Sequence, residues 1–134
     1  MLKFSTKSQY GLRAMVYLAR SKKKISSLKE ISKREGIPFD YLEKIFSKLE
    51  KNKLIKAKKG IQGGYFLCRM PSKIKLGEIV RVLEGEMALV RCIASQNKYS
   101  CPRDKKCLTK IFWKKIQDSL NKTLDSLTLA DLIK

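Results

Sequence analysis

The feature that most constrains the fold is a pair of short amphipathic segments on either side of a glycine. The first segment should be a helix over Leu28–Glu35. Ser27 precedes it, and a serine followed three residues later by glutamate is typical of a capping box. Gly36 can adopt the left-handed conformation that ends a helix, and Pro38 fits the first turn of the next one. The sequence therefore predicts two helices joined by a tight turn.

The second helix of the pair should run over Pro38–Asn52. Its apolar residues recur at i, i+3, i+4 and i+7, which places them on one buried face. They are Leu42, Ile45, Phe46 and Leu49. The opposite face carries charged and polar side chains, namely Asp40, Tyr41, Glu43, Lys44, Ser47, Lys48 and Lys51. We therefore expect one face to be buried and the other to remain free.

Two strand-like runs follow, Leu54–Lys58 and Tyr65–Arg69, and a glycine-rich stretch separates them. This pattern is typical of a β-hairpin. A helix-turn-helix followed by a hairpin is a winged helix-turn-helix, whose second helix enters the major groove of DNA. We assign residues 1–72 to this domain and residues 73–134 to a second unit, in which a cysteine loop spans about 88–104.

The remaining helices complete a mainly α fold with a small β-hairpin. We expect a first helix over Thr6–Ala19 with Ser5 or Thr6 as its N-cap, a short helix over the apolar residues from Leu76 to Leu83, and a last turn near Thr128–Ile133. A long C-terminal helix should span Lys105–Leu120. Its apolar surface exceeds what an isolated appendage needs, so it is predicted to be a dimerisation helix in a homodimer.

The charge of the chain indicates a polyanionic partner. The 134 residues contain 31 lysines and arginines against 12 acidic residues, a formal net charge of +19. Double-stranded DNA is the first candidate, and the alternative is a lysine-rich composition that reflects solubility or a low-GC genome. No apolar run reaches the ~18 residues of a membrane span, and no secretory signal is recognisable. We therefore expect no membrane contact and a cytoplasmic location.

Candidate DNA contacts lie on the free face of the second helix and on the hairpin. Lysines there should bind phosphates, whereas the carboxylate of Glu43 should accept a hydrogen bond from the amine of a cytosine. The alternatives are an ordinary solvated face for the lysines, a surface partner within the helix for Glu43, and a plain turn for the glycines. The candidate residues are Tyr41, Glu43, Lys44, Lys48, Lys58, Lys59, Gly60, Gln62, Gly63 and Gly64.

A second constellation consists of Cys92, Cys101 and Cys107, surrounded by lysines and arginines. Cytosolic thiols stay reduced, so these residues suit metal binding or redox chemistry better than a disulfide framework. Three thiolates are suitable ligands for an iron–sulfur cluster. The alternatives are a structural zinc ion and a thiol switch without metal. If Asp104 caps the long helix, Cys107 falls in its first turn. Cys68, on the second strand, is expected to be a small buried side chain.

The segments Tyr41–Phe46 and Gly60–Tyr65 resemble the Rrf2 family of bacterial winged helix-turn-helix regulators. Ser5–Lys7, Leu76–Val80 and Cys107–Thr109 extend this resemblance to both ends of the chain. Within the family the chain is most similar to the iron–sulfur cluster regulators and the nitric-oxide sensors. The resemblance implies a homodimer that binds a palindromic operator, carries a [2Fe–2S] or [4Fe–4S] cluster on the three cysteines, and uses the glutamate at position 43 to select promoters.

The fourth ligand of such a cluster departs from the family pattern. The cluster regulators have a histidine three residues after the last cysteine, whereas this chain has Lys110 there and no histidine at all. The nitric-oxide sensors take an aspartate from the partner's first helix, where this chain reads Lys7–Gln9. An exogenous thiol, water, or a residue of the partner's first helix remain, together with the chain's own Asp104, Glu84, Glu86 and Cys68.

These observations predict a transcriptional regulator, acting as a repressor, that senses redox state, iron–sulfur status or nitric oxide. Gain or loss of the cluster should reorder the loop over residues 90–106 and change operator affinity. A second class is a small redox or electron-transfer enzyme whose basic surface docks an acidic partner. The chain lacks histidine, a nucleotide-binding glycine loop and an acid/base constellation, so we expect no enzymatic activity.

Overall fold

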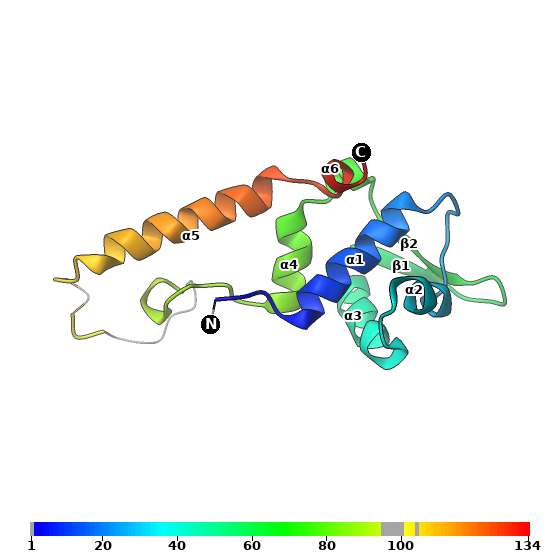
Figure 1. Cartoon of the computed structure of the whole chain (residues 1–134), viewed down its shortest axis with the longest axis horizontal. Coiled ribbons are helices and arrows are strands. Elements are labelled where there is room, and N and C mark those ends of the chain that lie inside the picture. Colours follow the sequence, from blue (N-terminus) through cyan, green and yellow to red (C-terminus); the bar gives the residue numbers. More distant parts are fainter. Residues whose placement is uncertain (1, 95–100, 104) are drawn as a thin grey trace.

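The computed structural model describes residues 2–94, 101–103 and 105–134 (Figure 1). Its helices are α1 (Thr6–Arg20), α2 (Leu28–Glu35), α3 (Phe39–Lys51), α4 (Leu76–Glu84), α5 (Thr109–Ser126) and α6 (Leu129–Leu132). Two strands, β1 (Ile55–Lys58) and β2 (Gly64–Leu67), form an antiparallel sheet, and short 3-10 turns, η1 (Pro71–Lys73) and η2 (Arg91–Ile93), flank α4. The predicted mainly α fold with a small hairpin is confirmed.

The turn between α2 and α3 forms as the local signals predict, with two corrections. Gly36 adopts φ 65°, and the Ser27 hydroxyl caps α2 by accepting from the backbone N–H of Glu30 at 3.1 Å. The second half of the expected capping box is wrong, because the Glu30 carboxylate accepts from Tyr17 and Lys23 instead. Pro38 precedes the first turn of α3 rather than belonging to it. The two helices are nevertheless joined as expected.

The hydrophobic core draws on α1, α2, α3, α4 and α6 and on the first strand, whereas α5 has no buried residue. The predicted stripe of α3 is buried, with Phe46 and Leu42 fully inaccessible. Leu129 of α6 is also fully buried, and its backbone N–H donates to the Ile74 carbonyl at 2.9 Å. The end of the chain therefore packs against the helical domain again after α5, which extends away from it. The core contains residues from both sides of position 72.

The hairpin is tied to the rest of the domain at its base. β1 and β2 pair in a register from Ile55 opposite Leu67 to Lys58 opposite Gly64. Tyr65 also exchanges two backbone hydrogen bonds with Ser26, at 3.0 and 2.7 Å. This isolated antiparallel bridge connects β2 to the segment before α2. The second strand ends at Leu67, two residues earlier than the sequence predicts.

The long helix α5 extends away from the helical domain and lies beside the segment that follows α4 (Figure 1). It begins four residues later and ends six residues later than the apolar pattern predicts. The later start arises because the backbone N–H of Lys106 donates to the Arg103 carbonyl, which makes a turn where the helix was expected. Within the described residues, no helix is both long and apolar enough to cross a membrane.

Candidate nucleic-acid interface and cysteine site

The outer face of α3 is free to contact a ligand. Glu43, Lys44 and Lys48 are all exposed, as the sequence predicts. Tyr41 is half-buried, and its ring packs edge-on against Tyr10, with centroids 5.5 Å apart. Tyr41 thus helps to fix α3 against α1, whereas the charged side chains project from the surface.

Two contacts hold the hairpin in a fixed position relative to α3. The Glu50 carboxylate accepts from the backbone N–H of Ala57 at 3.0 Å. The ring of Phe46 packs edge-on against Tyr65 with centroids 4.9 Å apart. Burial raises the pKa of the Tyr65 hydroxyl, and the nearby carboxylates of Glu50 and Glu43 raise it further. The helix and the hairpin therefore present a single pre-organised surface.

The tip of the hairpin has a backbone that only glycine permits at several positions. Gly60 has φ 122°, a conformation that L side chains rarely adopt. A Cβ at Gly63 would lie 2.2 Å from the Lys58 carbonyl oxygen, and one at Gly64 would lie 2.4 Å from that of Ser26. Gly60 and Gly63 are required by the turn itself, and Gly64 by the close approach of Ser26. A role of their backbone N–H groups in DNA binding would be a second function, separate from this structural one.

The side chains around this tip are exposed. Lys58, Lys59 and Gln62 all lie open to solvent, and their role in DNA binding stays a prediction. Ile61, which the sequence reasoning did not single out, is also fully exposed. An isoleucine at the tip of a hairpin between two candidate DNA contacts is suited to apolar contact with a groove wall. Its position between Gly60 and Gln62 was the available signal.

The three loop cysteines lie on separate local structures. Cys92 belongs to η2, Cys101 lies in the described stretch 101–103, and Cys107 lies two residues before α5 rather than in its first turn. Each is half-buried and free. Across residues 2–94, 101–103 and 105–134, no group of three metal-ligating side chains gathers around one point. The expected cap Asp104 lies outside the described residues.

Cys107 has the most specific surroundings of the three. Its sulfur lies 3.1 Å from the Thr109 hydroxyl oxygen in a hydrogen bond. This bond, followed by those from the backbone N–H groups of Lys110 and Thr109 at the start of α5, lowers the pKa of the Cys107 thiol. The beginning of α5 therefore favours an anionic sulfur, as expected for a helix N-terminus.

Two of the candidate fourth ligands have surroundings that the sequence did not reveal. Cys68 is exposed, so the prediction that it is a buried core residue is wrong, because the strand ends one residue before it. Glu84 is engaged within its own subunit. Its carboxylate oxygen accepts from the Ser5 backbone N–H and the Ser8 hydroxyl, both at 2.6 Å.

Helix α4 carries three charged residues at a spacing of three, and each binds a different element. Glu78 pairs with Arg69 at the end of the hairpin, with 2.9 Å between Oε1 and Nη2. Arg81 pairs with Asp125 of α5 at 2.6 Å. Glu84 completes the series through its contacts with the start of α1. Sequence reasoning treated α4 only as an amphipathic linker, although the charged spacing was visible.

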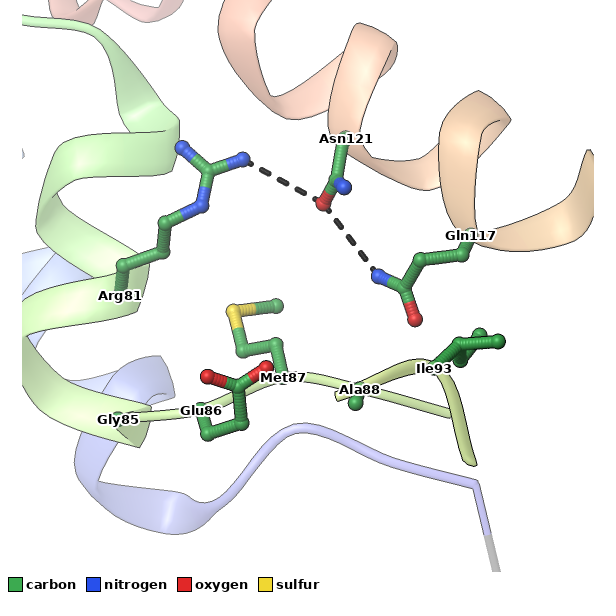
Figure 2. Close-up of a pocket in the computed structure, with 8 residues that line it drawn as sticks. All are labelled: Arg81, Gly85, Glu86, Met87, Ala88, Ile93, Gln117 and Asn121. Atoms are coloured by element: carbon green, nitrogen blue, oxygen red, sulfur yellow. Dashed lines mark hydrogen bonds between the residues drawn. The ribbon is translucent and has the colours of Figure 1, made fainter. Parts of the chain in front are cut away.

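The segment that links α4 to Cys92 passes below a small polar cavity of about 260 Å³ (Figure 2). In the figure, Arg81 of α4 and the amides of Gln117 and Asn121 on α5 point toward one another above this segment. The side chain of Met87 points up into the same space.

Comparisons with known proteins identify the family. A family model described as "Rrf2: Iron-dependent Transcriptional regulator" matches residues 4–134. The HTH-type transcriptional regulator IscR of Escherichia coli O1:K1 is 35% identical over 133 residues, which are 98% of this chain and 80% of that protein.

Two solved structures agree with this assignment. T. potens IscR is 41% identical with a TM-score of 0.78, covering 98% of this chain and 86% of its own. CymR, described as the global cysteine regulator of B. subtilis, is 36% identical with a TM-score of 0.83, covering 99% and 97%. The winged helix-turn-helix fold is confirmed, and the chain belongs to the Rrf2 family of transcriptional regulators.

Proposed function

We propose that this regulator reads DNA with the outer face of α3 in the major groove and the hairpin tip on the adjacent backbone or minor groove. The observation that carries this proposal is the exposed set of Glu43, Lys44 and Lys48 beside a hairpin that is anchored through Ala57 and exposes Lys58 and Lys59 at its tip. The lysines position the protein on phosphates, and Glu43 selects a base. The remaining candidate contacts of the interface are Tyr41, Gly60, Gln62, Gly63 and Gly64.

Selection from a random-sequence duplex pool tests this function. The full-length protein should enrich an inverted repeat, and its affinity should fall steeply as salt increases, because phosphate contacts release counterions. Enrichment of no sequence at all would contradict the proposal. The duplex recovered in this way is called the selected duplex below.

The regulator acts, in this proposal, as a homodimer on a palindromic operator. Support comes from the apolar side chains of Ile111 and Phe112 on α5, which are 70% and 54% exposed, and from the adjoining Leu108 at 86%. Such a contiguous exposed apolar face marks an interaction surface. A two-fold symmetric dimer carries two copies of α3, which matches the two half-sites of a palindrome.

The sensing function proposed is an iron–sulfur cluster held by Cys92, Cys101 and Cys107. The donor set fits, because three thiols free of disulfides supply soft anionic ligands, and the start of α5 donates hydrogen bonds to one of them. The family's description as iron-dependent also supports this proposal. The bound cluster would supply redox and ligand-exchange chemistry at the iron.

The fourth ligand of this cluster lies outside the three cysteines. Glu84 is already bound to Ser5 and Ser8, so a carboxylate at this position would have to give up two hydrogen bonds. A fourth position filled by an exchangeable ligand gives oxygen, nitric oxide or a thiol access to iron. This suits a cytoplasmic sensor better than an electron carrier.

Anaerobic purification followed by iron and acid-labile sulfide analysis and a Mössbauer spectrum tests the cluster. Wild-type protein should be brown and contain iron and sulfide in equal amounts. A variant with Cys92, Cys101 and Cys107 changed to serine should contain neither, and Cys68→Ser serves as the matched control that retains both. Colourless wild-type protein with zinc in place of iron and sulfide would contradict the proposal and assign a structural zinc ion.

A second candidate is a regulator that uses the same cysteines as a thiol switch without metal. The solved structure of S. aureus CymR favours it, because it is described as an oxidized form and is similar to this chain, at 31% identity and a TM-score of 0.76. B. subtilis CymR also matches this chain over 97% of its own length. Metal-free protein whose operator affinity changes on reversible thiol oxidation would support this candidate.

Both candidates are proposed to repress transcription, because a dimer seated on an operator excludes the polymerase from an overlapping promoter. Reporter expression from a promoter that carries the selected duplex should rise when the gene for the protein is deleted. A fall in expression would show activation instead and contradict the repressor assignment.

A further inference from the structure

A chain of hydrogen bonds joins the segment before Cys92 to α4. The side-chain carbonyl of Gln117 accepts from the Leu89 backbone N–H at 2.8 Å. The Gln117 amide nitrogen donates to the Asn121 carbonyl oxygen at 3.4 Å, and an Arg81 guanidinium nitrogen donates to that same oxygen at 3.4 Å. Figure 2 shows the two latter bonds meeting at Asn121. We name Gln117, Asn121 and Arg81 the polar relay.

The segment between Gly85 and Leu89 has a defined conformation at both of its ends. Gly85 has φ 80°, so it forms a bend that other residues would strain. Leu89 is held by its bond to Gln117. Between them, Met87 borders the cavity of about 260 Å³, so the segment can shift without displacing a close-packed core. We name residues 85–89 the strap.

The polar relay ends on α4, which packs on α1 and α3 and is ion-paired to Arg69 at the end of the hairpin. Arg81 lies between Glu78 and Glu84 on α4, three residues from each. Glu78 binds Arg69 at the end of the hairpin, and Glu84 binds the first turn of α1. A displacement of α4 would therefore move its contacts with the hairpin and with the first turn of α1 at the same time.

We propose that the polar relay couples the chemical state of Cys92 to the DNA-reading surface, with Gln117 as its positioning residue. Cys92 lies three residues beyond Leu89, within the turn η2 that packs on α5. Any change that moves Cys92 pulls on the strap and alters the bond between Leu89 and Gln117. Gln117 passes this change through Asn121 to Arg81. The inference rests on the proposed sensing role of Cys92 and assigns its route.

The test uses the full-length chain with Cys68, Cys101 and Cys107 changed to serine, so that Cys92 is the one thiol. Iodoacetamide adds a carbamidomethyl group to the half-buried Cys92 and so enlarges a side chain that is already partly enclosed. The dissociation constant for the selected duplex is measured before and after alkylation. The expected change is about 5-fold or more, within the usual range of allosteric coupling.

Three further variants in this background locate the route. Gln117→Leu removes both hydrogen bonds, and the change on alkylation should fall to less than about 2-fold while the unmodified protein keeps its affinity. Gln117→Glu retains an acceptor for Leu89 and should preserve part of the coupling. Gln9→Leu makes the same chemical change on α1, where the Gln9 amide donates to the nearby Phe4 carbonyl, and should preserve all of the coupling.

A reciprocal measurement distinguishes coupling from simple loss of structure. Because binding linkage is symmetric, the selected duplex should change the equilibrium exposure of Cys92, and hence its alkylation rate, in the parent and not in Gln117→Leu. A general loosening would instead accelerate alkylation equally with and without DNA. Retention of the full effect in Gln117→Leu, or no effect in the parent, overturns the polar relay. Failure to enrich any duplex overturns the proposed function itself.

Discussion

At the residue scale, single side chains fix the arrangement of the helices that carry the DNA-reading surface. Glu84 is the clearest case, because its carboxylate oxygen receives two hydrogen bonds from the first turn of α1. Burial alone would raise the pKa of this carboxyl, but the bonds from Ser5 and Ser8 outweigh burial and lower it below its ordinary value of 4.5. The charged form of Glu84 therefore stabilises the folded state.

The first prediction concerns Glu84→Gln. A folded-state pKa below the unfolded one contributes stability that is present above about pH 4.5 and is lost as the pH falls through the folded-state value. The substitution should lower the free energy of unfolding by about 1 kcal/mol at pH 7. Urea titrations across pH should show this difference shrinking below pH 4.5. Glu43→Gln, at an exposed carboxylate, is the matched control, and an equal loss in it would contradict the account.

The second prediction concerns Glu43 as a base-selecting residue. Glu43→Ala removes an acceptor and a negative charge from the exposed face of α3. It should reduce discrimination at one base pair of each half-site by about 1–3 kcal/mol and increase non-specific binding. Competition binding with single-base variants of the selected duplex measures this loss. Asp118→Ala on α5 is the control, and unchanged discrimination in Glu43→Ala would remove the selectivity role.

Residue-level reasoning from the sequence worked where the signal is local. Gly36, the Ser27 cap and the buried stripe of α3 follow from neighbouring residues, and all three are confirmed. The partners of Glu84 are separated from it by 76 and 79 residues, so no local pattern could reveal them. Cys68 was mistaken for a buried residue because the second strand was predicted to extend two residues too far.

At the element scale, α3 and the hairpin act as one surface, because Glu50 and the Phe46–Tyr65 contact lock their relative position. The hairpin also receives the ion pair from Glu78 to Arg69, whose guanidinium lowers the pKa of that carboxyl. The hairpin is therefore anchored on two sides. Its tip alone, between Lys58 and Gly64, projects free of these contacts.

The third prediction measures how the tip engages DNA. Lys58→Gln and Lys59→Gln should each reduce the slope of log affinity against log salt by about 0.9 for every phosphate that the variant no longer neutralises. Base discrimination should remain unchanged, because phosphate contacts carry no sequence information. Lys114→Gln on α5 removes the same charge away from the tip and should leave the slope unaltered. If all three variants change the slope equally, the tip has no special role.

The element with the poorest sequence prediction is α5. Apolar periodicity identified the helix, but both predicted ends were wrong. The turn at Arg103–Lys106 delays its start. Leu124 is the one apolar residue between Leu120 and the observed end at Ser126, so the apolar pattern gives little signal for that end. The three cysteines were found from spacing and residue type alone. Their arrangement around a common centre stays a prediction.

At the scale of the whole molecule, α5 extends from a compact helical domain (Figure 1). It carries several exposed apolar side chains. The core explains how the domain holds together, because Leu129 of α6 returns to it after the long excursion. The exposed side chains of α5 are left without a covering element in the described part of the single chain. A second copy of the chain is the covering element that we propose.

The fourth prediction tests this assembly. Phe112 and Ile116 are 54% and 41% exposed, and changing both to glutamate should convert a dimer into a monomer. The helical domain of this monomer should still unfold at the same temperature as the domain in wild-type protein. Sedimentation velocity at micromolar concentration measures the mass. Lys114→Glu is the control on the same helix and should leave the dimer intact. Wild-type protein that sediments as a monomer would remove the basis for palindrome recognition.

The central claim is that the state of Cys92, Cys101 and Cys107 sets the affinity for DNA. The most direct test is the dissociation constant of the selected duplex, measured anaerobically for cluster-loaded protein, for the same protein after iron removal, and for the triple cysteine-to-serine variant. We predict that the dissociation constants of the loaded and iron-free proteins differ by about 5- to 150-fold. The dissociation constant of the triple variant should not change on treatment that removes iron. Equal affinity of the triple variant and the loaded wild type would contradict this claim.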